Sequence, residues 1–331
     1  MPYDDINNFH LENHKYAFFD IFSKDHVICM ISPFYFEDKY DSSEVESIEI
    51  FDMKNDKKIQ LIGNFENKSL EPLSVRIYNN ITNDKYTNIK VICTYKNIKY
   101  EKEFILENKM SNYDNKDLLI QTTLLKDDYK YIGIFKKYYE KHGVDKFYFY
   151  YNGDISKNKE IFDFESCNTK IIEWNYKYWL DANNVNKVAH HAQPSQIHHA
   201  LYKYGKNMAE YILINDLDEY ITIEDMTMKQ MIEKDKRANY IFQNYWCDYD
   251  LKPDINILGK VNVSKRKQFP VRSKCIHNID IINFIGIHLP GHPVAELNII
   301  EKSKLLHFFK ITHPHNYEKC GYELDLNNME I

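Results

Sequence analysis

Hydrophobic and polar residues alternate in short runs through the first third of the chain. The run HVICMISPF is apolar, and the runs VESIEIFDM and LSVRIYNN show the period of two that half-buried strands have. Asn, Asp, Pro and Gly separate these runs. No run here follows a helical period. The pattern predicts an all-β, sandwich-like domain over residues 1–115, which ends in a polar segment without pattern at 107–117.

The pattern changes after that segment. DLLIQTTLL predicts a buried strand, DDYKYIGIFKKYYEKHG an amphipathic helix ending at a glycine, and DKFYFYYNGD a second strand. The strand TKIIEWN, the helix PSQIHHALYKYGKN and the strand AEYILIN follow, and TIEDMTMKQMIEKDK predicts a helix with a capping box of Thr222 and Asp225. This alternation predicts an α/β domain with a mostly parallel sheet over 116–331. We expect it to fold without the first domain.

An acidic cluster follows the last of these buried strands, in the stretch ILINDLDEYI. Asp216 and Asp218 are separated by one residue, and Glu219 comes next. The carboxyl ends of strands in α/β sheets are where ligands bind. Carboxylates in this arrangement suit a divalent cation, which can bridge to a nucleotide diphosphate. The alternative is a solvated turn whose acids cap the following helix.

Several segments resemble glycosyltransferase family 92. SQIHHALYKYGKNMAEYILINDLDEYI resembles the core of that family, with its Gln-led helix and its strand closing in Asp-hydrophobic-Asp-Glu. LIQTTLLKDDYKYIGIFKKYYEKHGVDKFYFYYNGD resembles the opening of the domain, and RSKCIHNIDIINFIGIH and LLHFF resemble later blocks. The resemblance covers about residues 118–309. It implies a GT-A fold, a UDP-sugar donor, usually UDP-galactose, a glycan acceptor, inverting chemistry, and Mn²⁺ (or Mg²⁺) at a D-x-D motif.

The resemblance also assigns roles to individual residues. Asp216 would lie nearest the ribose and the metal, Asp218 would bind the metal, and Glu219 would support the site. His307 in LLHFF would complete the metal shell, whereas the alternative is a core histidine bonded to backbone. The nucleotide pocket would be lined by Thr122, Thr123, Leu125, Asn152, Gly153, Asp154 and Gln196.

The sequence does not identify the catalytic base. Inverting transfer needs a carboxylate that deprotonates the acceptor hydroxyl, and the candidates are Glu296, Asp248 and Asp280. The basic stretch SKRKQFPVRSK, which contains Lys274, could meet the diphosphate or form a solvated hairpin. The histidine pairs at 190–191 and 198–199 have no acid that completes a ligand set, so packing or solvent roles are predicted for them.

Composition and charge indicate which kinds of partner and which cellular compartment the protein has. The net charge of −6 comes without a basic block, which argues against a nucleic-acid partner. No apolar run reaches the ~18 residues of a membrane helix, and the first residues lack a signal-peptide pattern. The six cysteines are scattered without a CxxC pair. We therefore expect a cytoplasmic protein with reduced thiols, and the oligomeric state stays open.

The leading interpretation is a metal-dependent hexosyltransferase that uses a UDP-sugar. Two other interpretations remain: a catalytically silent carbohydrate-binding protein, and a metal-dependent nucleotidyltransferase or phosphotransferase that uses the same acids. No Ser-His-Asp order, G-x-S-x-G or P-loop occurs, which argues against serine hydrolases and P-loop NTPases.

Overall fold

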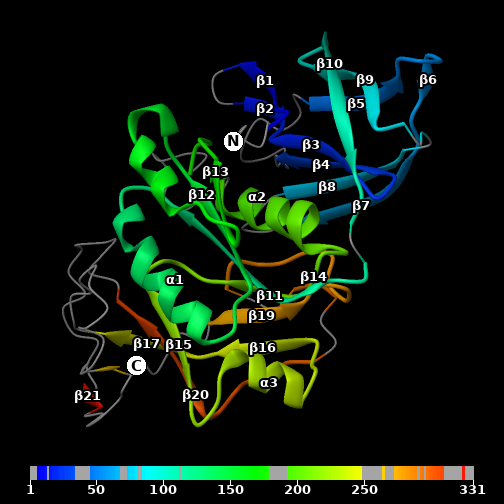
Figure 1. Cartoon of the computed structure of the whole chain (residues 1–331). Helices are drawn as coiled ribbons and strands as arrows, with labels where there is room; N and C mark the ends of the chain where they lie inside the picture. The colour runs from blue at the N-terminus through cyan, green and yellow to red at the C-terminus, as the bar shows by residue number, and fades with distance from the viewer. Residues whose placement is uncertain are drawn as a thin grey trace. The chain divides into compact units, whose positions relative to one another are not determined.

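The computed structural model describes residues 6–12, 15–33, 45–67, 73–80, 82, 84–111, 113–178, 192–247, 263–264, 272–288, 291–293, 296–308 and 323–324. The chain divides into two compact units (Figure 1). Unit 1 comprises Met1–Lys116 and Asn175–Met208, and unit 2 comprises Asp117–Trp174 and Ala209–Ile331. The chain therefore passes between the units three times.

Unit 1 is built on an eight-stranded sheet with the order β6-β5-β9-β10-β3-β4-β8-β7. Its neighbouring strands pair antiparallel, except that the end of β10 runs parallel to β3. The buried core draws on both halves of the sheet, with Ile21 and Met30 from one half and Ile50 and Val91 from the other. The strand-rich N-terminal region predicted from the alternation is thus confirmed. The strands are β1 (Phe9–Glu12), β2 (Lys15–Phe18), β3 (Asp20–Lys24), β4 (Val27–Pro33), β5 (Val45–Asp52), β6 (Lys57–Lys58), β7 (Leu61–Asn67), β8 (Leu73–Asn79), β9 (Tyr86–Tyr95) and β10 (Ile98–Lys109).

Unit 1 also holds the helix α2 (Ala192–His199), which continues as the π-helical segment η6 (Ala200–Gly205). Every residue of both segments is buried, and α2 packs against β4 and β8. The carboxylate of Asp20 on β3 accepts from Lys203 Nζ at 2.9 Å and lies 2.8 Å from His199 Nε2. Lys24 Nζ donates to the carbonyl oxygens of Tyr202 and Lys203 near the helix end.

The division at 115/116 suggested by the sequence therefore differs from the observed one. It puts the helix at 192–205 with the α/β domain, whereas buried charges on β3 bind this helix into unit 1. A fragment starting at residue 116 would expose the buried face of that helix, so the basis for expecting it to fold alone is lost. His198 and His199 have the packing role predicted for them, since His198 Nδ1 lies 2.7 Å from Pro194 O.

Unit 2 contains a six-stranded sheet with the order β13-β12-β11-β14-β19-β16. The first four strands of this order run parallel, while β19 runs antiparallel to both β14 and β16. The sheet is therefore mixed, with three parallel and two antiparallel pairings, so the mostly parallel sheet expected from the alternation is not confirmed. Its strands are β11 (Asp117–Leu125), β12 (Lys146–Tyr151), β13 (Thr169–Glu173), β14 (Ala209–Ile214), β16 (Asn239–Phe242) and β19 (Lys274–Asn278).

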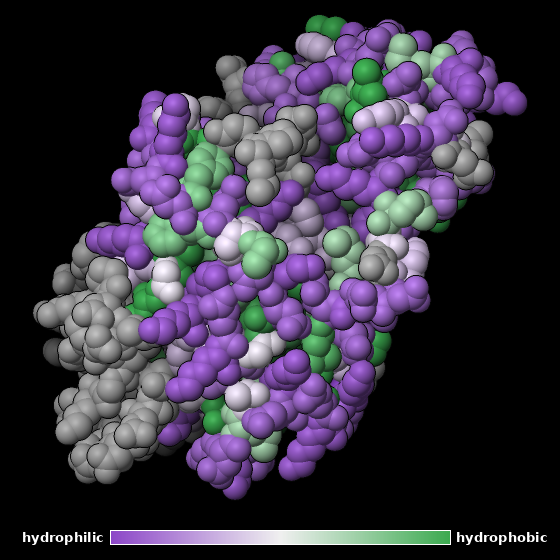
Figure 2. Space-filling model, viewed as in Figure 1, coloured by the Kyte–Doolittle hydropathy of each residue, from purple (hydrophilic) through white to green (hydrophobic). Residues whose placement is uncertain are grey.

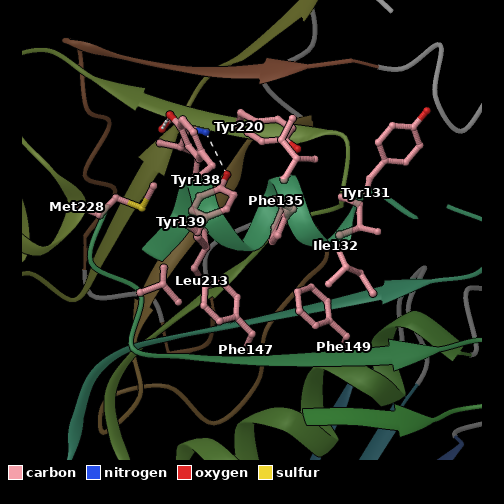
Figure 3. Close-up of a cluster of buried hydrophobic side chains, with 14 of the residues drawn as sticks. Tyr131, Ile132, Phe135, Tyr138, Tyr139, Phe147, Phe149, Leu213, Tyr220 and Met228 are labelled. Carbon is pink, nitrogen blue, oxygen red and sulfur yellow. Dashed lines mark hydrogen bonds between the residues drawn. The ribbon is translucent and has the colours of Figure 1, made fainter. Parts of the chain in front are cut away.

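The helix α1 (Ile132–Lys141), preceded by η2 (Tyr129–Tyr131), connects β11 to the parallel strand β12. The predicted glycine stop is present, because Gly143 takes a φ of +92° that a side chain would strain. Figure 3 shows the side chains of α1 between Phe147 and Phe149 of β12 on one side and Tyr220 on the other. The short segments η3 (Ile155–Lys157) and η4 (Lys159–Phe164) follow β12.

A second sheet in unit 2 has the order β15-β20-β17-β18-β21. Here the structure corrects the predicted capping box of Thr222 and Asp225. Thr222 lies within β15, and the helix α3 starts later with a capping box between Thr227 and Gln230. Pairing of β15 with β20 outweighs the local helix signal at Thr222. The elements are β15 (Glu219–Ile223), α3 (Met228–Lys234), β17 (Asn244–Cys247), β18 (Val263–Ser264), β20 (Ser303–His307) and β21 (Glu323–Leu324).

The surface is mainly polar where residues are described. Hydrophilic residues cover most of the face shown in Figure 2. Among the described segments, no helix combines the length and the apolar character needed to cross a bilayer.

Candidate active site

The acidic residues form a tight turn directly after β14. The backbone N–H of Asp216 donates to Glu219 Oε2 at 2.8 Å, and the N–H of Glu219 donates to the carbonyl oxygen of Asp216 at 3.0 Å. We call residues 216–219 the acid turn. It joins the last strand of the parallel set to β15 of the second sheet. The acids therefore lie at the carboxyl edge of the parallel strands, where ligands meet α/β sheets.

Two antiparallel strands bring a lysine and a histidine to the acid turn. Cys275 on β19 pairs with Ile214 at the end of β14, so Lys274 begins β19 beside the turn. His307 ends β20 and pairs with Glu219 on β15. Both residues reach the acids because their strands run opposite to the strands that carry the acids.

Hydrogen bonds and ion pairs join these five side chains. Lys274 Nζ donates to Asp216 Oδ2 at 2.8 Å and lies 3.4 Å from Glu219 Oε2. His307 Nε2 lies 3.3 Å from Asp218 Oδ2, and its Nδ1 lies 3.5 Å from Glu219 Oε1. The Asp216 side chain is 33% exposed, compared with 11% for His307 and at most 2% for the others. Asp216 is therefore the most open member of the cluster.

Burial and charge set the protonation states of the cluster. Burial alone would raise the pKa of Asp216, but Lys274 outweighs it and lowers this pKa. Burial raises the pKa of Glu219 to about 7. Burial opposes the charged form of His307, but the nearby Asp218 outweighs it and raises the pKa of the imidazole. The cations of Lys274 and His307 thus balance most of the charge that the three acids carry.

Part of the cluster fits a divalent cation. A six-coordinate ion with ligands at about 2.1 Å places neighbouring ligands about 3 Å apart. Asp218 Oδ2 and His307 Nε2, at 3.3 Å, come close to that spacing. In the described part of the chain no group of three or more His, Cys, Asp or Glu is arranged to hold an ion. The arrangement therefore fits an ion that takes two protein ligands here and further oxygens from elsewhere.

Lys274 has a different position from the diphosphate contact suggested by its basic stretch. Its side chain is wholly buried, and both carboxylates that it contacts belong to the acid turn. A buried ammonium in this position neutralises Asp216 and Glu219 and holds them in place. The contacts of Lys274 among the described residues are thus with the acids of the turn, and its role toward the diphosphate stays a prediction.

The strand ends that were expected to line a nucleotide pocket do lie at the same edge of the sheet as the acids. Thr122, Thr123 and Leu125 end β11 and are buried. The hydroxyl of Thr122 donates to the carbonyl oxygen of Tyr148 at 3.1 Å within the sheet. Leu125 contributes its carbonyl oxygen, which accepts from Asn152 N at 2.7 Å. These contacts join the ends of β11 and β12.

The segment after β12 is held by local bonds. Asn152 Nδ2 donates to the carbonyl oxygen of Trp174 at 2.8 Å, and Asp154 accepts from Ser156 N at 3.0 Å as the cap of η3. A Cβ on Gly153 would come within 2.9 Å of the Tyr151 ring, so only glycine fits there. Gln196 belongs to α2 of unit 1, where it is buried.

The structure does not bring the proposed catalytic bases to the acids. Asp280 is exposed beyond the far end of β19, where Ile279 N bonds to Glu210 O at 2.9 Å. The backbone of Glu296 accepts from Asn239 at the start of β16, which is the same far edge. Both therefore lie a strand length from Lys274. Asp248 lies outside the described residues.

Asp128 is an acid that the sequence reasoning missed. It follows the carboxyl end of β11, in LLKDDYK, and caps the start of η2. The pKa of Asp128 is raised to about 6, mainly by burial and in part by the negative charges of Asp218 and Asp216. His288 also acts on the cluster, since its charge contributes to the lowered pKa of Asp216. The signal available for Asp128 was its place after a buried strand, which is the same signal that indicated Asp216.

Comparison with known proteins identifies the family of the chain. The sequence profile of glycosyltransferase family 92 matches residues 120–320, more than half of the chain. The matched span includes the acid turn, Lys274 and His307. No curated protein matches the chain significantly. The chain therefore belongs to glycosyltransferase family 92 and is a glycosyltransferase.

Proposed function

We propose that this glycosyltransferase moves galactose or a related hexose from a UDP-sugar to a hydroxyl of a glycan acceptor, with inversion, on a GT-A-type fold. The observation that carries the proposal is the acid turn at the carboxyl edge of the parallel strands, with His307 Nε2 3.3 Å from Asp218 Oδ2. An ion site beside strand ends suits a substrate that carries a diphosphate.

Asp218 and His307 would hold Mn²⁺ or Mg²⁺ in this proposal. When bound, the ion supplies positive charge that offsets the charge developing on the departing UDP. Asp216, the most exposed acid of the turn, would face the donor. Glu219 and Lys274 would keep the acids in place from beneath, because both are buried and bonded to the turn.

Deprotonation of the acceptor hydroxyl needs a carboxylate on the acceptor side of the sugar. Asp280 and Glu296 lie at the opposite edge of the sheet, so we assign this role to Asp128. Its pKa of about 6 lies near neutral pH, which suits a general base. Asp128 follows β11 and lies close enough to Asp216 and Asp218 for their negative charges to raise its pKa.

We expect UDP together with Mn²⁺ to stabilise the protein against heat. A ligand at a hundred times its Kd adds about 2.7 kcal/mol to the free energy of unfolding. For a unit of this size that raises Tm by roughly 5–10 °C. UDP with EDTA and Mn²⁺ alone are the controls, and each should give a much smaller shift.

Incubation with a panel of UDP-sugars and Mn²⁺ then identifies the reaction. Release of UDP supports a glycosyltransferase with a UDP-sugar donor. Release of pyrophosphate from nucleoside triphosphates would instead point to a nucleotidyltransferase. A thermal shift with no UDP released from any sugar nucleotide, with or without glycan acceptors, would favour a carbohydrate-binding protein without turnover.

Replacing His307 by Ala should weaken Mn²⁺ binding to the UDP-loaded protein at least tenfold and leave the protein folded. The reason is that the imidazole is one of two protein ligands whose spacing fits the ion. Calorimetric titration of Mn²⁺ into the UDP-loaded variant measures this. His142→Ala is a matched control, because His142 is a histidine of the same unit outside the acid turn. Wild-type Mn²⁺ affinity in a folded His307→Ala protein would show that His307 is not a ligand.

A further inference from the structure

Asn215 stands between the last residue of β14 and the acid turn, and its side chain is completely buried. Its amide bonds to three different elements. Its Oδ1 accepts from Gln121 Nε2 of β11 at 3.2 Å. Its Nδ2 donates to the hydroxyl of Tyr139 on α1 and to the carbonyl oxygen of Glu219 on β15, both at 2.9 Å. One side chain therefore ties a strand end and a helix to the turn that carries the acids.

The hydroxyl of Tyr139 completes this arrangement. It donates to the carbonyl oxygen of Glu219 at 2.8 Å and accepts from Ile221 N at 3.1 Å, in addition to the bond from Asn215. A phenolic hydroxyl has one proton and two acceptor positions, so all three are used. The ring is fully buried and lies against Phe135, with ring centroids 4.6 Å apart (Figure 3). Tyr139 thus has a fixed position set by packing on α1.

Together these bonds hold both ends of the acid turn. Asn215 precedes Asp216, and the carbonyl oxygen of Glu219 follows Asp218, so the two catalytic acids lie between anchored points. Through Gln121 the same network joins the turn to the strand end that carries Thr122 and Thr123. The network is buried, where hydrogen bonds are strong and an unpaired polar group is costly.

We infer that Asn215 and Tyr139 are positioning residues of the active site, which set where the carboxylates of Asp216 and Asp218 meet the donor relative to the end of β11. This inference rests on the proposed function of the acid turn. A displacement of about 1 Å at a reacting centre can reduce a rate about a hundredfold. Anchors on a rigid helix and a central strand prevent such displacement.

Tyr138 is a matched control for Tyr139. It is the neighbouring residue on α1, it is also buried, and its hydroxyl donates to the carbonyl oxygen of Ile221 at 2.7 Å. That bond reaches β15 beyond the acid turn and does not contact Asn215 or Glu219. Removing either hydroxyl deletes one buried oxygen from the same helix. A purely structural role for Tyr139 would lower Tm but leave kcat/KM near the wild-type value in assays run well below Tm.

The experiment compares Tyr139→Phe, Asn215→Ala and Tyr138→Phe for Tm, for kcat and KM with the UDP-sugar that the wild type uses, and for UDP–Mn²⁺ affinity. All assays are run well below the lowest Tm. We expect Tyr139→Phe and Asn215→Ala to lower kcat/KM at least tenfold, mainly through kcat, and Tyr138→Phe to stay within twofold of wild type. The Tm of Tyr139→Phe should fall further than that of Tyr138→Phe, because it loses three buried hydrogen bonds rather than one. The double variant Tyr139→Phe/Asn215→Ala should have the same kcat/KM as the less active of the two single variants, because the two residues belong to one network.

Equal losses of activity in Tyr139→Phe and Tyr138→Phe, or wild-type activity in both Tyr139→Phe and Asn215→Ala, would overturn the inference. If Tyr139→Phe does not fold, Gln121→Met tests the link to β11, with the same tenfold loss expected and wild-type activity contradicting it. Asp218→Asn in the same assay tests the proposed function separately from the positioning role. An active Asp218→Asn protein would refute the proposed function. An inactive one beside a fully active Tyr139→Phe protein would refute only the positioning role.

Discussion

Replacing Asp218 by Asn is expected to lower turnover at least a hundredfold while the protein remains folded. Asn has the shape of Asp but lacks the charge that the His307 imidazole and a divalent cation would face at this position. The side chain is only 2% exposed, so solvent screening does not replace the lost charge. Stability should change little because Asp218 is the main group that raises the pKa of His307, so the imidazole can lose its proton once that charge is removed. Release of UDP from the donor and the thermal unfolding temperature measure the two effects.

Asp225→Asn is the control for Asp218→Asn. Asp225 is an exposed acid shortly after the acid turn, with a φ of 61° that Asn tolerates as well as Asp does. This variant loses the same charge without touching the cluster, so its turnover should equal that of the wild type. If Asp218→Asn keeps more than half of the wild-type turnover, the acid turn is not where the donor is activated.

Replacing Asp20 by Asn should destabilise unit 1 by about 3–5 kcal/mol, the range observed when one partner of a buried ion pair is removed. The Asp20 carboxylate is wholly buried and is shared by Lys203 at 2.9 Å and His199 at 2.8 Å. Its removal leaves a buried ammonium without its counter-ion. Urea unfolding followed by circular dichroism measures the change. Glu49→Gln, which removes one partner of the exposed pair with Lys58, should have little effect.

The same residue predicts a dependence of stability on pH. Burial alone would raise the pKa of Asp20, but Lys203 and His199 outweigh it and lower this pKa below its ordinary value of 3.8. A lowered carboxyl pKa stabilises the folded state above the ordinary value, and this stability is lost as the pH falls toward the folded-state pKa. Wild-type stability should therefore fall below about pH 4, with a smaller fall in Asp20→Asn. Parallel pH profiles for the two proteins would contradict the ion-pair account.

The local hydrophobic pattern was sufficient to predict a helix or strand where that pattern was long. The run DLLIQTTLL coincides with β11, because the apolar residues at 118–120 and 124–125 mark a strand that is largely buried. The helix before Gly143 and the strand that leads to Asp216 are likewise confirmed. The acid turn could be predicted because a strand that ends in several acids has few structural reasons to do so.

Properties that depend on the order and direction of strands could not be predicted. Lys274 and Asp280 lie at opposite ends of β19, and only the antiparallel pairing of β19 with β14 shows which of them is beside Asp216. The helix at 192–205 has the same sequence pattern whichever unit it joins. Its place follows from Asp20, a residue 179 positions before His199. No local pattern records a contact of that separation.

The buried contact between Asp20 and Lys203 also has a consequence for synthesis on the ribosome. The strands of unit 1 emerge first, but the ammonium that neutralises Asp20 emerges 183 residues later. Until then the Asp20 carboxylate of the nascent sheet lacks the partners that α2 and η6 will supply. By that time β11 to β13 of unit 2 have already been made. Unit 1 is thus completed from a segment that interrupts unit 2, before β14 and the acid turn appear. All segments of unit 1 have therefore been made before β14, the acid turn and the strands that carry Lys274 and His307 are synthesised.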